Sequence, residues 1–268
     1  MSDPFENVDA ASPQMIDIIA SALETRAEDT DMLPVIDAYL DAIAVGDGGH
    51  IVDIGSGTGG ITRRIADRFP KALVTGLEPS TALTEKAKEL AGDRSNLTFR
   101  LGDGGALDVD SDTIDVAILH TVLSHVQSPE PLVSEAVRIL RPGGSLVICD
   151  ADFSKAKMGV VPGDPLGSCA DAFVAGAVTD PWVAGKLKPL VNTARLETRH
   201  FSVLNRVVTS GMGSMVWVRM STARMVADGV IGQPLADALE AEYLRRAEAG
   251  TLYCVLPFVT LIATKQTS

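Results

Sequence analysis

Residues 52–60 read VDIGSGTGG, and this short stretch decides the class of fold. An acidic residue and four glycines stand between an apolar run and the expected start of a helix. A glycine-rich turn between a strand and a helix lets the backbone approach a ligand closely, and it points the free N–H groups of the helix at that ligand. Two classes of cofactor use such a turn, and the glycines alone do not distinguish between them.

Short strands and helices alternate from this turn onward. Strand-like runs occur at 50–55, 72–78, 97–103, 113–120 and 145–152, with helical spacing at 61–70, 80–93 and 129–140. Such alternation predicts a parallel sheet with helices on both faces and right-handed connections. Two later strand-like runs, at 196–204 and 251–265, bring the expected number to seven. We therefore expect an α/β fold with a doubly wound, mostly parallel, seven-stranded sheet.

The chain is expected to form one domain with additions to a central core. Residues 1–46 are predicted to be an N-terminal helical extension, because apolar side chains recur there at three- and four-residue intervals. The cofactor-binding core would span 47–204, a mainly helical insertion 205–250, and the last strand would lie in 251–268. Within the core, residues 153–180 are rich in Gly, Pro, Ala and Asp and are expected to form a loop.

Composition limits the classes of partner. Of 268 residues, 46% are apolar, which is enough for a sizeable core, and the net charge is −12 with a pI near 4.7. Such a charge repels nucleic acid, and no Lys/Arg cluster offsets it, so we expect no nucleic-acid partner. No run of about 18 apolar residues predicts a membrane span, and the acidic N-terminus does not have the layout of a secretory signal.

Cysteine and histidine usage also carries information about the class of protein. Three widely spaced cysteines indicate free thiols in a reducing compartment, so a cytoplasmic protein is expected. The four histidines have no partner at the spacing of a metal site, and no metal is expected.

The glycine turn fits two patterns. Gly55, Gly57 and Gly60 satisfy the G-x-G-x-x-G fingerprint of dinucleotide-binding domains. Gly55, Gly57 and Gly59, preceded by Asp53, form D-x-G-x-G-x-G, which resembles motif I of class I S-adenosylmethionine-dependent methyltransferases. Glu78, at the end of the second strand, suits both patterns, because both cofactors offer a ribose diol to a carboxylate.

The surroundings of the turn favour the methyltransferase family. Asp103 lies in GDGG after the third strand, and the segments HTVLSHVQSPEPL (120–132) and EAVRILRPGGSLVICD (135–150) resemble that family's later blocks. The Y-x-x-x-K pair that a short-chain reductase would need is absent from the sequence. The resemblance covers about residues 50–152, and it extends to the broad group of ubiquinone-type and natural-product small-molecule methyltransferases.

The resemblance implies a set of cofactor-binding residues for S-adenosyl-L-methionine. Glu78 would bind the ribose hydroxyls, Asp103 the adenine edge, and the backbone carbonyl of His120 the cofactor's ammonium group. The complete set implied by the resemblance is Asp53, Gly55, Ser56, Gly57, Thr58, Glu78, Pro79, Ser80, Asp103, Gly104 and His120.

Several of these residue types have a plainer structural interpretation, which the sequence leaves open. Asp103 could simply form an Asx turn before two glycines, and His125 could pack or cap a helix. The methionines and tryptophan of 212–225 fit a core stripe as well as they fit a substrate pocket.

A general base is needed only if the methyl acceptor is still protonated. The candidates are the ring of His120 and the carboxylate of Asp152, although Asp152 could equally cap a strand end. The expected walls of the acceptor site contain few Arg or Lys, which favours an apolar or aromatic small molecule. Whether O, N, C or S is methylated is left open, as is the oligomeric state, with a homodimer as one option.

Three functions therefore follow from the sequence. The first is a methyltransferase of small molecules that works by direct in-line transfer. The second is an NAD(P)-dependent oxidoreductase that uses the same glycines, and the third is a non-catalytic cofactor-binding module.

Overall fold

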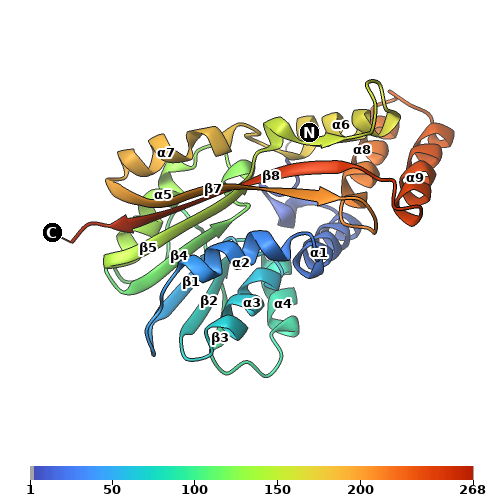
Figure 1. The fold of residues 1–268 in the computed structure, drawn as a ribbon. Coiled ribbons are helices and arrows are strands. Elements are labelled where there is room, and N and C mark those ends of the chain that lie inside the picture. The colour runs from blue at the N-terminus through green and yellow to red at the C-terminus, as the bar shows by residue number, and fades with distance from the viewer. Residues whose placement is uncertain (1–2, 268) are drawn as a thin grey trace.

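A computed structural model describes residues 3–267, and a single sheet runs through its centre (Figure 1). Its strands are β1 (His50–Ile54), β2 (Leu73–Glu78), β3 (Leu97–Leu101), β4 (Ile114–His120), β5 (Leu140–Ala151), β6 (Lys157–Met158), β7 (Leu196–Val208) and β8 (Cys254–Lys265). Neighbouring strands follow the order β3-β2-β1-β4-β5-β8, and both β6 and β7 pair with β8.

The sheet is mostly parallel, as predicted. Strands β1 to β5 pair in parallel, whereas β8 runs antiparallel to β5, β6 and β7. Within residues 3–267 the sheet has eight strands rather than seven. The additional strand, β6, has two residues, which is too short for any periodicity to indicate it.

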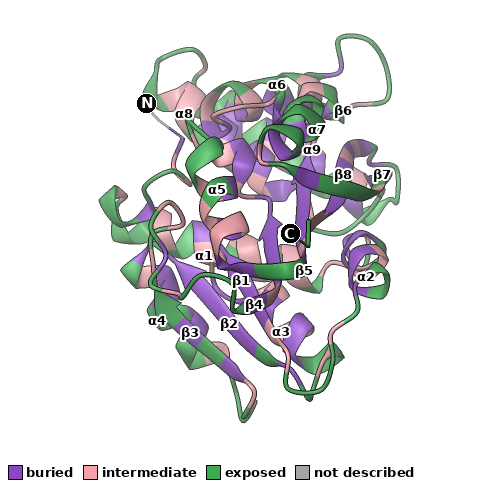
Figure 2. Cartoon of the chain, turned by 90° about the vertical axis from the view of Figure 1, so that its left-hand side faces the viewer, coloured by how far each residue is buried: buried purple, intermediate pink, exposed green. Residues whose placement is uncertain are grey.

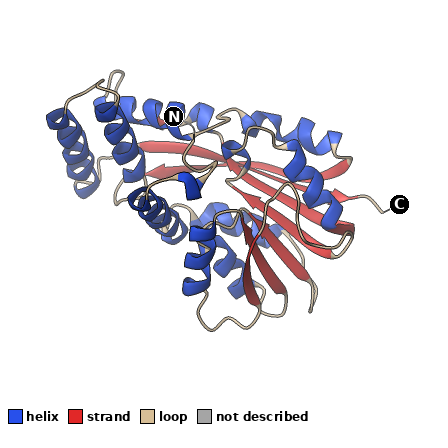
Figure 3. Ribbon diagram, turned by 180° about the vertical axis from the view of Figure 1, so that it is seen from behind, coloured by secondary structure: helices blue, strands red, loops and turns tan. Residues whose placement is uncertain are grey.

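The helices cover both faces of the sheet (Figure 3). They are α1 (Pro13–Glu28), α2 (Leu33–Ala42), α3 (Gly60–Arg68), α4 (Thr81–Leu90), α5 (Glu130–Ile139), α6 (Pro165–Ala177), α7 (Val183–Thr193), α8 (Met215–Ala227) and α9 (Gln233–Glu248). Ser12 and Ser80 cap α1 and α4 by accepting hydrogen bonds from Met15 and Leu83 N–H groups.

Two apolar cores form on opposite faces of the sheet. Helices α5 and α7 bury their apolar stripes against one face, and α2 and α3 pack on the other, where α6, α8 and α9 extend the same core. The central strands β1 and β4 are almost wholly buried between these layers (Figure 2). Strands covered on both faces are typical of parallel sheets, and this explains their nearly continuous apolar sequence.

The prediction of a loop over 153–180 was wrong, because α6 occupies residues 165–177. Asp164 accepts a hydrogen bond of 3.1 Å from the N–H of Leu166, and Pro165 takes the first helical position. The helix is rich in Gly and Ala, but its buried face includes Leu166, Cys169 and Phe173 and packs against α8. Packing has therefore outweighed a composition that looked like a loop.

The segments predicted to surround the substrate gather at one end of the sheet. Helices α6, α8 and α9 pack on one another near the start of β8 (Figure 1), and α1 packs against α3 and α4. In the described part of the chain, no helix combines the length and the apolar character that crossing a membrane requires. The three cysteines are free and buried.

Candidate functional site

A cavity of about 790 Å³ opens at the carboxyl ends of β1, β2 and β4. Its size falls within the usual range of small-molecule sites. In a sheet of this kind the chain order reverses between β1 and β4, and ligands bind in the crevice at such a point. The other walls come from the N-terminal segment, α1, α6, α8 and β8.

The glycine turn needs its glycines for two reasons. Gly55, Gly57 and Gly59 all have positive φ angles, at 77°, 56° and 80°, which side chains strongly disfavour. A Cβ atom on Gly55 would lie 2.6 Å from the Val122 side chain, and one on Gly59 would clash with the Phe99 ring. The turn therefore lies close against its neighbours, and it delivers the chain to the start of α3.

Glu78 links the end of β2 to this turn. One carboxylate oxygen, Oε2, accepts a hydrogen bond of 2.8 Å from the N–H of Gly57, and Oε1 accepts one of 3.1 Å from the N–H of Ser80. Burial raises the pKa of Glu78, although both hydrogen bonds favour the charged form. The side chain also lines the cavity, so Glu78 can shape the turn and contact a ligand.

Four buried polar atoms of the cavity lining have no hydrogen-bond partner in residues 3–267. They are Oδ1 of Asp53, Oγ of Ser56, Nε2 of His120 and Nε of Arg206. Buried polar groups in folded proteins are nearly always paired, and leaving one unpaired costs about 1–3 kcal/mol. A polar ligand in the cavity would supply the missing partners.

Asp53 is 1% exposed, and its second oxygen accepts a hydrogen bond of 2.6 Å from the Thr62 hydroxyl. Burial raises the pKa of Asp53 to about 6, partly offset by the bond from Thr62. Because Thr62 lies on α3, this bond fixes the end of β1 relative to the helix that follows the turn.

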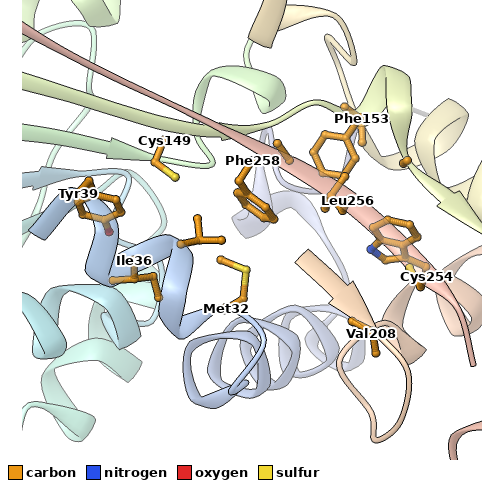
Figure 4. Close-up of a cluster of buried hydrophobic side chains, with 14 of the residues drawn as sticks. Met32, Ile36, Tyr39, Cys149, Phe153, Val208, Cys254, Leu256 and Phe258 are labelled. Carbon is orange, nitrogen blue, oxygen red and sulfur yellow. The ribbon is translucent and has the colours of Figure 1, made fainter. Parts of the chain in front are cut away.

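His120 ends β4, and its ring lies between α2 and β8. The Tyr39 hydroxyl shares a hydrogen bond of 3.2 Å with Nδ1 of His120, and the Phe258 ring stacks with the imidazole with centroids 6.3 Å apart. Figure 4 shows Tyr39 and Phe258 among the apolar side chains of this face. Burial, followed by the nearby charge of Arg26, lowers the pKa of His120 to about 3. The ring is therefore neutral near pH 7.

Asp103 and Gly104 line the cavity after β3. Asp103 accepts a hydrogen bond of 2.9 Å from the N–H of Gly105, which is the Asx turn left open by the sequence. Its other oxygen, Oδ2, makes no bond to the described residues. A Cβ on Gly104 would lie 3.2 Å from Ile54 and 3.3 Å from Leu132, so the backbone is close to both apolar side chains.

Not every predicted site residue reaches the cavity. Gly55, Gly57 and Pro79 line it, whereas Thr58 and Ser80 are buried behind the turn. Ser80 instead caps α4, as described above. Thr58 accepts a hydrogen bond from Arg63 through its backbone carbonyl.

Asp152 also lies outside the cavity lining, although its neighbours Ala151 and Phe153 belong to it. The carboxylate of Asp152 accepts a hydrogen bond from the Ser154 hydroxyl, and the Asp152 N–H donates to the carbonyl of Pro257. These bonds fit the plainer interpretation of Asp152, in which its carboxylate caps the end of a strand. The structure does not bring Asp152 and His120 together.

An aromatic cluster forms the end of the cavity away from the glycine turn. Phe173 stacks on Trp217 with centroids 5.3 Å apart and ring planes at 11°, and Phe153 lies 6.4 Å from Trp217. Trp217 is at once buried and part of the cavity wall, so this side chain belongs to the apolar core and can also contact a ligand. The methionines of 212–225 do not line the cavity.

Two arginines of the cavity wall were missed in the sequence. Arg26 of α1 and Arg206 of β7 both line the cavity, so the expectation of walls with little positive charge was wrong at these positions. Arg26 lies three and four residues after Leu23 and Ala22, which also line the cavity. Those spacings put the three side chains on one helix face, and this was the signal available in the sequence.

The N-terminal segment was also missed as part of the site. Residues 5–8 line the cavity, and the segment is held on both sides of them. Asp3 accepts hydrogen bonds of 2.8 Å from Nδ1 of His125 and of 3.0 Å from the Thr179 N–H. Asp9 accepts bonds from the Ser80 hydroxyl and the Thr81 N–H at the start of α4.

Comparison with known proteins agrees with this geometry. Residues 52–148 match the family model described as a methyltransferase domain. The chain is 32% identical over 125 residues to a demethylmenaquinone methyltransferase of Tropheryma whipplei, covering 47% of this chain and 50% of that protein. It is also 32% identical over 116 residues to a ubiquinone/menaquinone biosynthesis C-methyltransferase of Paracoccus denitrificans, covering 42% and 46%. The chain thus matches about half the length of these relatives.

Solved structures share the fold at low identity. A Haemonchus contortus phosphoethanolamine N-methyltransferase in complex with S-adenosyl-L-methionine superposes with a TM-score of 0.59 at 17% identity, covering 94% of this chain and 57% of that one. The [4+2]-cyclase SpnF gives a TM-score of 0.60 at 18% identity, covering 100% and 98%. The match to the methyltransferase-domain model confirms the resemblance to class I methyltransferases, and these structures confirm the α/β fold.

Proposed function

We propose that this chain is an S-adenosylmethionine-dependent methyltransferase that acts on an apolar or aromatic small molecule. The observation that carries the proposal is the set of unpartnered buried atoms of Asp53, Ser56 and His120 in one cavity with Glu78. The cofactor has a ribose diol, an ammonium group and a carboxylate, which can satisfy atoms of these types. The methyltransferase-domain match over 52–148 supports the same conclusion.

The proposed cofactor site keeps the roles that the resemblance implies. Glu78 accepts from the ribose hydroxyls, Asp103 accepts from the adenine amino group through its free Oδ2, and Gly55 to Gly57 line the methionine part. Asp53 and the carbonyl of His120 orient the ammonium group. When bound, the cofactor supplies an electrophilic methyl carbon on a sulfonium, so the protein mainly has to align the acceptor and exclude water.

The acceptor is proposed to bind at the aromatic end of the cavity. Phe153, Phe173 and Trp217 offer flat apolar surface, which is suited to an aromatic or extended apolar body. This end and the glycine turn belong to one cavity, which allows an acceptor to meet the cofactor without crossing solvent.

His125 is our proposed general base when the acceptor carries a proton. It lines the cavity, Asp3 holds its Nδ1 at 2.8 Å, and its Nε2 has no hydrogen-bond partner in the described part of the chain. An oriented imidazole is a common base. His120 is less suited to that role, because a pKa of about 3 makes it a weak proton acceptor near pH 7. Asp152 lies outside the cavity lining.

Two measurements test the function. Calorimetric titration with S-adenosylhomocysteine and separately with NAD and NADP should give binding by the first compound alone. Transfer of a labelled methyl group from S-adenosylmethionine to a panel of aromatic and apolar acceptors should then give product. Binding of NAD or NADP in preference would favour an oxidoreductase, and cofactor binding without transfer would favour a non-catalytic module. The transfer assay is essential, because the similar fold of a [4+2]-cyclase means that the fold alone does not select the reaction.

A further inference from the structure

Arg206 is a buried arginine whose hydrogen bonds are incomplete. The residue is 3% exposed, and its Nη2 donates to the Asp29 carboxylate and, at 2.9 Å, to the carbonyl of Gly213. Its Nε is buried and has no partner among the described residues. Because Arg206 lines the cavity, a ligand there can accept the remaining hydrogen bond.

Arg26 supplies a second guanidinium in the same cavity. Its side chain makes no hydrogen bond or ion pair within residues 3–267, although eleven other arginines of this part of the chain pair with carboxylates at 3.0 Å or less. Burial, and then the neighbouring charge of Arg206, lowers the pKa of Arg26 to about 10, so the group stays charged near pH 7. No carboxylate of the described residues forms an ion pair with Arg26, although the charge of the buried Asp150 acts on it at longer range.

The charges at this place favour a monoanion. Arg206 forms an ion pair with Asp29, whereas Arg26 has no direct carboxylate partner among the described residues, so an anionic group in the cavity can bind Arg26 directly. A carboxylate carries one negative charge and two oxygens, and guanidinium groups bind it through charge-assisted hydrogen bonds. Arg206 contacts the loop that leads into α8, beside the aromatic cluster of Phe153, Phe173 and Trp217.

We infer that the methyl acceptor is an aromatic acid, whose ring lies in the aromatic cluster and whose carboxylate is held by Arg26 and Arg206. This inference rests on the proposed function, since it concerns the acceptor of that reaction. A carboxylate could also come from the cofactor's own methionine part, because Leu23 on the same face of α1 lies close to Gly57. The experiment must separate these two sources.

The test uses naphthalene-2-carboxylate and its uncharged counterpart naphthalene-2-carboxamide. Each is titrated calorimetrically into the protein saturated with S-adenosylhomocysteine. The wild type should bind the acid at least about tenfold more tightly than the amide, as expected for one charge-assisted hydrogen bond. Arg26→Gln should remove this preference while the affinity for the amide and for S-adenosylhomocysteine is unchanged.

Two further variants complete the experiment. Arg206→Lys keeps a charge opposite Asp29, which protects the fold, but it removes the Nε donor and should reduce the preference for the acid. Arg219→Gln changes an exposed arginine of α8 and should behave as the wild type. Circular dichroism and thermal melting check that each variant is folded.

Several results would overturn the inference. Equal affinity for the two probes, or no binding of the acid, would exclude an acid-binding subsite. A loss of S-adenosylhomocysteine affinity in Arg26→Gln, with the acid preference retained, would assign Arg26 to the cofactor. Failure of the proposed function looks different, because S-adenosylhomocysteine would then not bind, or it would bind while no acceptor was methylated. In that case, titration of the two probes into the protein without S-adenosylhomocysteine would still show whether the acid binds more tightly than the amide.

Discussion

The carboxylate of Glu78 accepts a hydrogen bond of 2.8 Å from the backbone N–H of Gly57, which joins the end of β2 to the turn after β1. One side chain thus shapes the loop and presents its charge to the cavity. Glu78→Ala should weaken S-adenosylhomocysteine binding by about 1–3 kcal/mol, because a buried hydrogen-bond partner is lost. Calorimetry measures this change. Glu85→Ala, an exposed glutamate of α4, serves as control, and equal affinities for both variants would contradict the assignment.

Asp103 allows a sharper test, since its turn and its proposed ligand contact use different oxygens. Asp103→Asn keeps an oxygen for the N–H of Gly105 but replaces the free oxygen with an amide NH₂ that cannot accept. We expect S-adenosylhomocysteine affinity to fall by about tenfold in Asp103→Asn, the loss of one hydrogen bond. If Asp103 only forms the turn, Asp103→Asn will bind like the wild type and Asp103→Ala alone will be impaired.

The buried ring of His120 should make stability depend on pH. Its pKa is about 3 in the folded protein against an ordinary 6.5, so only the unfolded chain takes up this proton between these values. Stability is therefore lost as pH falls from 6.5 toward 3, by about 2 kcal/mol at pH 5. Urea denaturation at pH 7.5 and pH 5.0 measures how much unfolding free energy each protein loses between these two pH values. We expect this loss to be smaller in His120→Gln than in the wild type, by about 2 kcal/mol. The same loss in the variant and the wild type would rule out this role, and His200→Gln serves as the histidine control.

His125 and Asp3 should affect the rate of reaction rather than cofactor binding. With an acceptor that must lose a proton, His125→Gln should lower kcat by about 10²-fold or more, the usual contribution of a general base. Asp3→Asn should have a smaller effect in the same direction, because the partner of Nδ1 keeps an acceptor oxygen but loses its negative charge. Initial rates measure the effect of each substitution on kcat, and calorimetric titration with S-adenosylhomocysteine measures its effect on cofactor binding. An unchanged kcat in His125→Gln would exclude it as the base.

Alanine substitutions at Gly59 and Gly48 distinguish the energetic cost of backbone strain from that of a steric clash. Both have φ near 80°, but a Cβ would clash with Phe99 only at Gly59, whereas Gly48 has nothing within 4 Å. Gly48→Ala should cost about 1–2 kcal/mol of unfolding free energy through strain, and Gly59→Ala about 2–4 kcal/mol. Urea denaturation at neutral pH measures both. Equal losses would mean that the clash is relieved by movement of Phe99.

The sheet and part of the candidate site could be predicted from the sequence, because the patterns that indicate them are local. Strands β1 to β5 and their helices follow one another closely along the chain, so periodicity and turns indicate each of them. Asp53 and Glu78 lie at the carboxyl ends of β1 and β2, and Asp103 follows β3. The carboxyl ends of neighbouring parallel strands meet at one edge of the sheet. Their proximity in the structure follows from that rule.

The remaining parts of the site depend on contacts between distant residues. Asp3 meets His125 across 122 positions, and Arg206 meets Asp29 across 177. No local pattern encodes these pairs, because they form only once the N-terminal helices pack over the end of the sheet. The same packing converts 165–177 into α6, where composition alone indicated a loop.

The attachment of residues 5–8 bears on how small molecules move in and out of the protein. This stretch is held by the side chains of Asp3 and Asp9 and by the packing of Val8 against Ile19 and Leu83, without any pairing to the sheet. Its displacement would therefore widen the interior while every strand pairing stayed intact. Substitutions at these few contacts are therefore expected to change the rates of ligand entry and release without weakening the sheet.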